Sequence, residues 1–326
     1  MTTVSFAELK KRQRSTSKED LKNKLNKETK SEGKDNRFWK PTMIKSSKGG
    51  DVVGTSSDVI RFLPESYADL KLVAEGKFSE LYLSPIFHRK HHAFQGPNGW
   101  YFEESRSMLI DENGSEEKCP VYERVKPMWD EAKETENKTR QNKLKEYFTK
   151  SEHIVNILVI KDGSNPENNG KVFLFKLTKA MKDKLDSCFE SEFEDEETFN
   201  PFDLEEGRAF ELKLEYKTKS FGNYTGPVAD YTKSKFQSTS TPLADSEEEI
   251  DEIMEQAHSF FSYLSKVKSE KELNEKLDKV FSFKAEKADH SEKEPESYES
   301  GASNDDDGNL DTDDEELQQY KDLLKG

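Results

Sequence analysis

Apolar residues along this chain gather in short runs with the period of β-strands. Residues 154–160 form the strongest run, and residues 171–177 follow it across a polar loop as its predicted antiparallel neighbour. Residues 210–216 alternate apolar and polar side chains, which is typical of a strand with one buried face. Shorter runs predict further strands at residues 59–63, 81–83 and 100–102. Strands of this length and spacing favour a small barrel or sandwich over a β-α-β sheet.

Other segments have the patterns of turns and helices. Residues 96–99 (Gly-Pro-Asn-Gly) predict a turn, and the Gly- and Ser-rich residues 46–57 predict a linker or a hairpin. Residues 123–150 are rich in Lys, Arg and Glu and predict a helix. Within residues 245–281, apolar side chains recur at helical spacing. The sequence therefore predicts a mainly β fold with added helices.

Composition limits how much of the chain can pack. Hydrophobic residues make up 32% of the 326 residues and charged residues 36%, whereas ordinary domains are nearer half and a quarter. These values predict one sizeable domain with polar stretches outside it. No apolar run reaches the roughly 18 residues of a membrane-spanning helix, and no secretory leader is recognisable. Two cysteines, Cys119 and Cys188, cannot make a disulfide framework, which favours a soluble protein of a reducing compartment.

The formal net charge of −16 is unevenly distributed. Residues 1–50 hold 14 basic and 6 acidic residues, a net of +8, and residues 285–326 hold 4 and 15, a net of −11. Ten acidic residues and no Lys or Arg lie in residues 186–206, which predict a solvated flap or a segment that orders against a neighbour's basic arm. Halves of opposite sign suggest nucleic-acid contact at one end and a partner-binding or self-masking tail at the other.

The sequence lacks the motifs of common enzyme chemistries. It contains no GxxxxGK[ST] phosphate loop, no GxGxxG after a strand, no GxSxG elbow and no HExxH. Acidic residues are so frequent in this chain that two neighbouring carboxylates do not indicate a catalytic acid–base pair. Because no residue supports catalysis, we expect a binding protein rather than an enzyme.

Aromatic and basic residues are interleaved in three places. Binding a single strand without sequence preference needs cations along the phosphates and aromatic faces for the bases. Tyr147 stands among four cations, Phe175 lies beside Lys176, and residues 217–236 alternate lysines with aromatics. Phe173 is expected in the core, while Phe175 could either pack or bind. The candidate DNA-binding residues are Arg61, Arg140, Lys143, Lys145, Tyr147, Lys150, Phe175, Lys176, Lys219, Phe221, Tyr224 and Tyr231.

Several short motifs follow one another in a recognisable order. They lie at residues 59–64 (VIRFLP), 92–97 ahead of 100–101, 119–121, 156–162, 166–168, 170–173, 200–203 and 221–224. This series resembles the single-stranded-DNA-binding (helix-destabilising) proteins of T-even-type tailed phages, in particular a marine-phage-like branch.

The resemblance implies a division of the chain into three parts. These are a basic arm (1–35), an OB-fold core (36–284) with an inserted lobe at about 84–125 and a helical part at 245–281, and an acidic tail (285–326). The arm would dock on a neighbouring protomer and make binding cooperative. Its basic-then-hydroxyl motif consists of Lys10, Lys11, Arg12, Arg14, Ser15 and Thr16. The tail would recruit other proteins and compete with DNA for the cleft.

The resemblance also implies a function. It points to cooperative, sequence-independent binding that protects and organises single-stranded DNA in phage replication, recombination and repair, in the cytoplasm of the infected bacterial host. The tail's partners would be the phage proteins of these processes. Tyr147, Phe175, Phe221 and Tyr224 fall at or near base-contacting aromatics of the family, and Phe175 stands where Tyr is frequent. Two alternatives remain: an RNA-binding translational regulator, and a protein-interaction hub that works through its acidic tail.

Founding members of that family bind zinc through one His and three Cys. His92 and Cys119 match two of these ligands, whereas Ser105 and Tyr122 occupy the other two positions. Structural zinc requires four ligands, normally nitrogen or sulfur. We therefore expect that the zinc site is lost and that the protein has no cofactor.

Two consequences follow for the residues around the former site. A substituted zinc site is the alternative, with replacement ligands among His88, His91, Glu103 and Asp111. Without zinc, Trp100, Tyr101 and neighbouring apolar residues are expected to hold the lobe together by packing.

Overall fold

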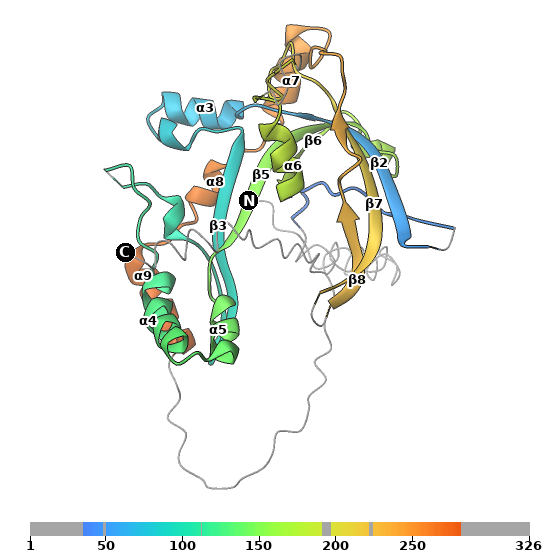
Figure 1. Ribbon diagram of the computed structural model, residues 1–326. Helices are drawn as coiled ribbons and strands as arrows, with labels where there is room; N and C mark the ends of the chain where they lie inside the picture. Colours follow the sequence, from blue (N-terminus) through green and yellow to red (C-terminus); the bar gives the residue numbers. More distant parts are fainter. Residues whose placement is uncertain (1–34, 48–49, 112, 191–196, 222–223, 282–326) are drawn as a thin grey trace, which may run out of the picture. The chain divides into compact units, whose positions relative to one another are not determined.

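The computed structural model describes residues 35–47, 50–111, 113–190, 197–221 and 224–281 (Figure 1). The chain divides into two compact units, Met1–Trp39 and Lys40–Gly326. In the described part of the first unit, Arg37 forms an ion pair of 2.7 Å with Asp35. All elements below belong to the second unit. The predicted arm motif and the predicted acidic tail lie outside the described residues.

One antiparallel sheet dominates the described part of the second unit. Its order is β4-β3-β5-β2-β7-β8, with β1 beside β2, β6 beside β5 and β9 beside β7. This arrangement confirms a mainly β fold. The strands are β1 (Ile44–Lys45), β2 (Val52–Phe62), β3 (Ile86–Gly96), β4 (Gly99–Glu104), β5 (Lys150–Lys161), β6 (Val172–Leu177), β7 (Phe210–Phe221), β8 (Tyr224–Asp230) and β9 (Lys235–Phe236).

The strongest sequence patterns correspond to strands. The run at 154–160 lies inside β5, and the run at 171–177 becomes β6, which pairs with β5 in antiparallel register. The alternating residues 210–216 begin β7, which continues to Phe221. The predicted turn at 96–99 joins β3 to β4, where Gly96 pairs with Gly99. These predictions are confirmed.

The prediction of a strand at residues 81–83 is wrong. Residues Glu80–Tyr82 form a single 3-10 turn, in which the Ser79 hydroxyl accepts the Leu81 N–H at 3.3 Å. Leu81 remains 70% exposed, so its side chain finds no sheet face to pack against. The neighbouring strand is β3 instead. Its His, Arg and Lys residues (HRKHH at 88–92) hide the apolar alternation that would have revealed it.

The described parts of the Gly- and Ser-rich stretch 46–57 pair as the two sides of a hairpin rather than forming a linker. Ile44 of β1 pairs with Thr55 of β2, and the Ser46 N–H donates to the Val53 carbonyl at 2.9 Å. The second half of this stretch is already part of β2, because Ser56 pairs with Leu214 of β7. Pairing on both sides thus makes a strand of residues with low strand propensity.

Helices flank the sheet. They are α3 (Tyr67–Ala74), α4 (Pro120–Glu134), α5 (Lys138–Lys145), α6 (Lys179–Asp186), α7 (Glu247–Glu255), α8 (Phe261–Leu264) and α9 (Glu270–Phe281). The predicted helix 123–150 is divided between α4 and α5 at Glu136, which has a φ of 50°, and its last residue already begins β5. The predicted helix 245–281 is divided into α7, α8 and α9.

The central strands are buried on both faces. One face carries Phe62 and Phe210, whose rings lie 5.6 Å apart, together with Ile157. On the other face, Leu158 belongs to a cluster that includes Met254 of α7. Burying a large apolar side chain stabilises the fold by roughly 1.5–3 kcal/mol, so this core sets the position of the strands.

Helices α4, α5 and α9 lie beside β3 (Figure 1), and a second apolar cluster joins them to β3 and β4. Phe94 and Tyr101 stack at 5.0 Å within it, and Leu277 of α9 is fully buried there. The turn after β3 touches α9 closely, because the Asn98 N–H donates to the Val280 carbonyl at 3.0 Å. A side chain at Gly96 would collide with Val280. The predicted packing role of Tyr101 is thus observed.

Candidate nucleic-acid interface

The candidate cations around α5 differ in how they are engaged. Arg140 forms an ion pair of 2.9 Å with Glu131 of α4. Lys143 and Lys145 are exposed, and within the described residues neither forms an ion pair. Asn137 caps the helix by accepting the Arg140 N–H at 3.0 Å. Lys143 and Lys145 can therefore meet phosphates without first giving up a carboxylate.

Tyr147 lies in the cluster of α4, α5 and α9 rather than at the surface. It is 7% exposed, and its ring meets Phe94 edge to face at 4.8 Å and Phe281 at 5.3 Å. Its carbonyl oxygen lies 3.1 Å from Nδ1 of His92. In this structure Tyr147 packs the core and offers no ring face to a base. Its assignment as a base contact stays a prediction.

Phe175 and Lys176 point to opposite faces of β6. Phe175 is 3% exposed and sits opposite Val155 on the face that carries Phe62, so the packing alternative describes it. Lys176 forms an ion pair with Glu152 of β5. Lys150, at the start of β5, is exposed, and the described residues give it no ion pair. Of these three candidates, Lys150 is thus the most available to an incoming phosphate.

Arg61 is an internal cation. It is 2% exposed, and its Nη2 donates to the Asp203 carbonyl at 2.7 Å, while a side chain at Gly207 would collide with it. Its Nε and Nη1 have no hydrogen-bond partner among the described residues. Burial lowers the pKa of Arg61 to about 10, so it remains charged at neutral pH. DNA cannot reach this guanidinium unless the covering residues 203–207 move.

The remaining candidates belong to the β7–β8 hairpin. Phe221 and Tyr224 pair across its end, and their side chains lie outside the described residues. Lys219, two residues before the end of β7, is exposed. Tyr231 follows β8 directly and is half-buried. The hairpin therefore presents at least one cation beside the two paired aromatic positions.

An ion-pair network that the sequence patterns did not predict joins three strands of the sheet. Arg89 of β3 pairs with Glu104 of β4 at 2.5 Å and with Glu152 of β5 at 3.0 Å. Burial lowers the pKa of Arg89, but the two carboxylates outweigh burial and raise it. Lys176 joins the network through Glu152. The only sequence signal of this network is the presence of opposite charges on β3 and β5. These charges can be paired only when the register of the strands is known.

The prediction that Trp100 packs the lobe is wrong. Trp100 is 56% exposed and Phe102 57% exposed, while Tyr101 between them is fully buried. The physical reason is the alternation of β4, which turns Tyr101 toward α9 and its two neighbours away from it. The sequence signal for this arrangement was the spacing of Trp100 and Phe102, which places both side chains on the strand face opposite Tyr101.

The residues at the family's zinc position do not fit that metal. His92 and Cys119 lie 3.1 Å apart, from Nε2 to Sγ, which is a hydrogen-bond contact. Ser105 begins a 3-10 turn by accepting the Ser107 N–H at 3.3 Å. Within the described residues no group of three or more His, Cys, Asp or Glu could hold a metal ion. A zinc ion would find one nitrogen and one sulfur, which is half of a structural site.

Comparisons with known proteins identify relatives of most of the described residues. A family model for proteins described as gp32 DNA binding protein like matches residues 54–281. The single-stranded DNA-binding protein of Enterobacteria phage T4 is 30% identical over 239 residues, which are 71% of this chain and 67% of the relative. The protein of the same description from Enterobacteria phage T2 has the same identity and coverage.

Proposed function

Because the chain belongs to the family of gp32 DNA binding protein like proteins, we propose that it binds single-stranded DNA cooperatively and without sequence preference. The match over residues 54–281 carries this proposal, since it spans the sheet and both apolar clusters. The relatives are binding proteins, and this chain is accordingly a DNA-binding protein rather than an enzyme. Its proposed role is to protect and organise single-stranded DNA in phage replication, recombination and repair.

We assign the sheet to the OB class. Support comes from β2, which pairs in antiparallel register with β5 on one side and β7 on the other. The face shared by these strands is filled with large side chains such as Phe62 and Phe210. The interiors of small barrels are filled by such side chains, and OB-folds bind oligonucleotides on one strand face and the adjoining loops.

Exposed cations supply the proposed electrostatic contact. Lys143, Lys145, Lys150 and Lys219 are exposed, and none of them forms an ion pair within the described ranges. Arg140 and Lys176 would have to exchange a carboxylate for a phosphate, which reduces their net contribution. Each phosphate neutralised on a single strand releases counterions and makes the affinity fall with salt.

The two ends of the chain carry the finer parts of the proposal. The arm, with a net charge of +8 in residues 1–50, is proposed to bridge neighbouring protomers. The tail, with a net charge of −11 in residues 285–326, is proposed to bind phage replication, recombination and repair proteins and to compete with DNA. These proposed roles of the arm and the tail rest on the net charges of the two segments and on the family resemblance.

The proposed location is the cytoplasm of the infected host, because the relatives are phage proteins and DNA is found there. In the part of the chain that the structure describes, no helix is both long and apolar enough to cross a bilayer. We also propose that the protein works without zinc, because only His92 and Cys119 remain of a four-ligand set.

Salt titration on poly(dT) tests the central proposal. The logarithm of the binding constant should fall linearly with the logarithm of salt concentration, with a slope near −0.7 per phosphate neutralised. The variants K143E and K145E should each weaken binding and flatten this slope, whereas K71E, at an exposed lysine of α3, is the control with the same change of charge. Absence of binding at low salt would refute the proposal.

Matched RNA and DNA oligomers separate the alternatives. Equal affinity for both would favour the RNA-binding regulator. Failure to bind either, together with capture of phage proteins by the tail alone, would favour the interaction hub.

A further inference from the structure

Two stacked rings stand exposed on one face of β4. The rings of Trp100 and Phe102 lie 5.3 Å apart with planes 13° from parallel. Each side chain is more than half exposed, whereas Tyr101 between them is buried in the cluster of α4, α5 and α9. One face of the β3–β4 ribbon is therefore covered by helices, and the other carries an open pair of aromatic rings.

The sheet register places cations in the rows next to these rings. Trp100 pairs with Gln95 and Phe102 with Ala93, and the following row on the same face contains Glu104, His91 and Lys150. The next row contains Arg89 and Glu152, with Lys176 beside them. With histidine counted as neutral, these rows hold three cations and two carboxylates.

Both carboxylates on this face are already neutralised. Glu104 pairs with Arg89, and Glu152 pairs with Arg89 and Lys176. Lys150, in the same row as His91 and Glu104, is exposed and forms no ion pair among the described residues. The face thus combines flat apolar surfaces with a residual positive charge.

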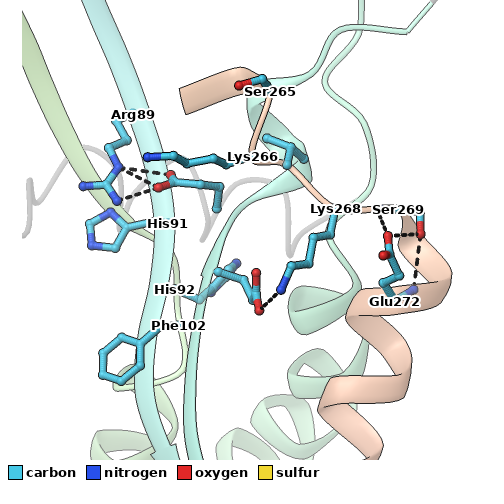
Figure 2. Close-up of a pocket in the computed structure, with 12 residues that line it drawn as sticks. Arg89, His91, His92, Phe102, Ser265, Lys266, Lys268, Ser269 and Glu272 are labelled. Carbon is cyan, nitrogen blue, oxygen red and sulfur yellow. Dashed lines mark hydrogen bonds and ion pairs between the residues drawn. The ribbon is translucent and has the colours of Figure 1, made fainter. Parts of the chain in front are cut away.

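A cavity continues the face beyond Phe102. It has a volume of about 690 Å³ and is lined by Phe102, Arg89 and His91 on one side and by Lys266 and Lys268 on the other (Figure 2). Lys268 pairs with Glu103 at 2.6 Å, whereas the ammonium of Lys266 lies over the ring of Tyr263 at 5.7 Å. Its volume lies within the ordinary range of small-ligand pockets, so it can take part of one nucleotide.

We propose that Trp100 and Phe102 form a base-stacking platform for single-stranded DNA, with Lys150 and Lys266 as its phosphate contacts. This inference rests on the proposed function and adds a specific contact surface to it. Stacking on aromatic rings is tolerant of sequence, since every base has a π-face. The charge of the sheet face favours a polyanion, because Glu104 and Glu152 are paired with cations while Lys150 forms no ion pair among the described residues. Glu272, which lines the cavity, accepts hydrogen bonds from Ser269 instead.

Tryptophan fluorescence supplies a direct test, with oligo(dT) as the probe. The other two tryptophans, Trp39 and Trp129, remain in a W100F variant, so the difference from wild type isolates Trp100. We expect oligo(dT) to quench the wild-type emission and W100F to lose that part of the quenching. Because a phenylalanine ring still stacks, W100F should keep its affinity within a few-fold, measured by anisotropy of a labelled oligomer.

Removal of the rings should weaken binding itself. F102A and W100A are each expected to lose roughly tenfold in affinity, within the range found for one stacked base. L81A removes another exposed apolar side chain, in the 3-10 turn, and should bind as wild type. Circular dichroism of each variant verifies that the fold is retained.

The outcomes are distinguishable. If wild type binds oligo(dT) with the expected salt slope while W100A and F102A bind equally well, the platform is wrong and the proposed function stands. If wild type does not bind oligo(dT) at all, both the platform and the proposed function are refuted. If the ring variants dissociate a DNA-free oligomer in sedimentation without changing DNA affinity, the face is a protein interface and the platform is again refuted.

Discussion

The side chain of Asn156 and the main chain of His258 form a reciprocal pair of hydrogen bonds. Nδ2 of Asn156 donates to the His258 carbonyl at 2.9 Å, and the His258 N–H donates to Oδ1 of Asn156 at 2.9 Å. Asn156 is fully buried in the middle of β5, and the two residues are 102 positions apart. This pair ties the connection between α7 and α8 to the centre of the sheet.

Loss of this pair should destabilise the whole core. N156A removes a donor and an acceptor from buried main-chain groups, so we expect the free energy of unfolding to fall by about 2–4 kcal/mol. N156D should cost at least as much, because its carboxylate would face the His258 carbonyl. Urea unfolding measures both, and N142A, at an exposed position of α5, is the control. An unchanged midpoint in N156A would contradict the assigned role.

Asp58 should make stability depend on pH. It is 2% exposed, and burial raises its pKa although the Ser56 hydroxyl and the Gly163 N–H, at 2.9 Å, both donate to it. A raised folded-state pKa means that the folded protein binds the proton more tightly. The stability associated with this group is full below the ordinary value of 3.8 and declines as pH rises through the folded value.

The variant D58N removes this titration. It should be more stable than wild type at pH 7, and the difference should vanish below the ordinary pKa. Thermal unfolding between about pH 3 and about pH 8 measures this difference in stability. D183N, at an exposed position of α6, should leave the profile unchanged. A D58N protein that is less stable than wild type at every pH would show that the hydrogen bonds accepted by the Asp58 carboxylate outweigh the cost of burying its charge.

Zinc should be dispensable. His92 and Cys119 already satisfy one another at 3.1 Å, and the surrounding cluster is held by apolar contacts such as Phe94 with Tyr101. Protein purified without a His tag is expected to contain far less than one zinc per chain, and a chelator should leave its melting temperature unchanged. One equivalent of zinc by elemental analysis would overturn this expectation and favour a substituted site.

Removal of the acidic tail should tighten DNA binding. Deletion of residues 285–326 eliminates a segment with a net charge of −11, which can compete with single-stranded DNA for the same cations. The gain should be largest at low salt and shrink as salt rises, because the screening length falls from about 30 Å at 0.01 M to about 3 Å at 1 M. Titration with oligo(dT) at several salt concentrations measures the effect. Equal or weaker binding would count against masking by the tail.

Removal of the arm should reduce cooperativity. Deletion of residues 1–20 removes the motif from Lys10 to Thr16. Binding to long poly(dT) should become less steep, whereas binding to an oligomer of one site length should change little. Isotherms on the two lengths measure this. A parallel loss on both would identify the arm as a DNA contact instead of a bridge between protomers.

Part of the fold could be predicted because its sequence signals lie in neighbouring residues. Residues 154–160 and 210–216 carry the strand period in consecutive positions, and the turn at 96–99 is encoded by its Gly-Pro-Asn-Gly residues. The uneven charge of the chain is likewise a property of the sequence alone. The order of the short motifs pointed to a family that the comparisons confirm.

The partners of individual side chains could not be predicted, because they depend on register and long-range packing. Tyr147 and Phe175 look like stacking residues in sequence, but both are buried in the structure. Lys176 looks like a free cation, but β5 places Glu152 beside it.

The sequence by itself determined the main strands, the distribution of charge and the family of this protein, because these follow from neighbouring residues and motif order. Only the tertiary structure decided which aromatics remain exposed and which cations remain unpaired. Trp100 stays open while Tyr101 is buried because α9 covers one face of β4. That contact joins segments far apart in the chain, and no local pattern encodes it.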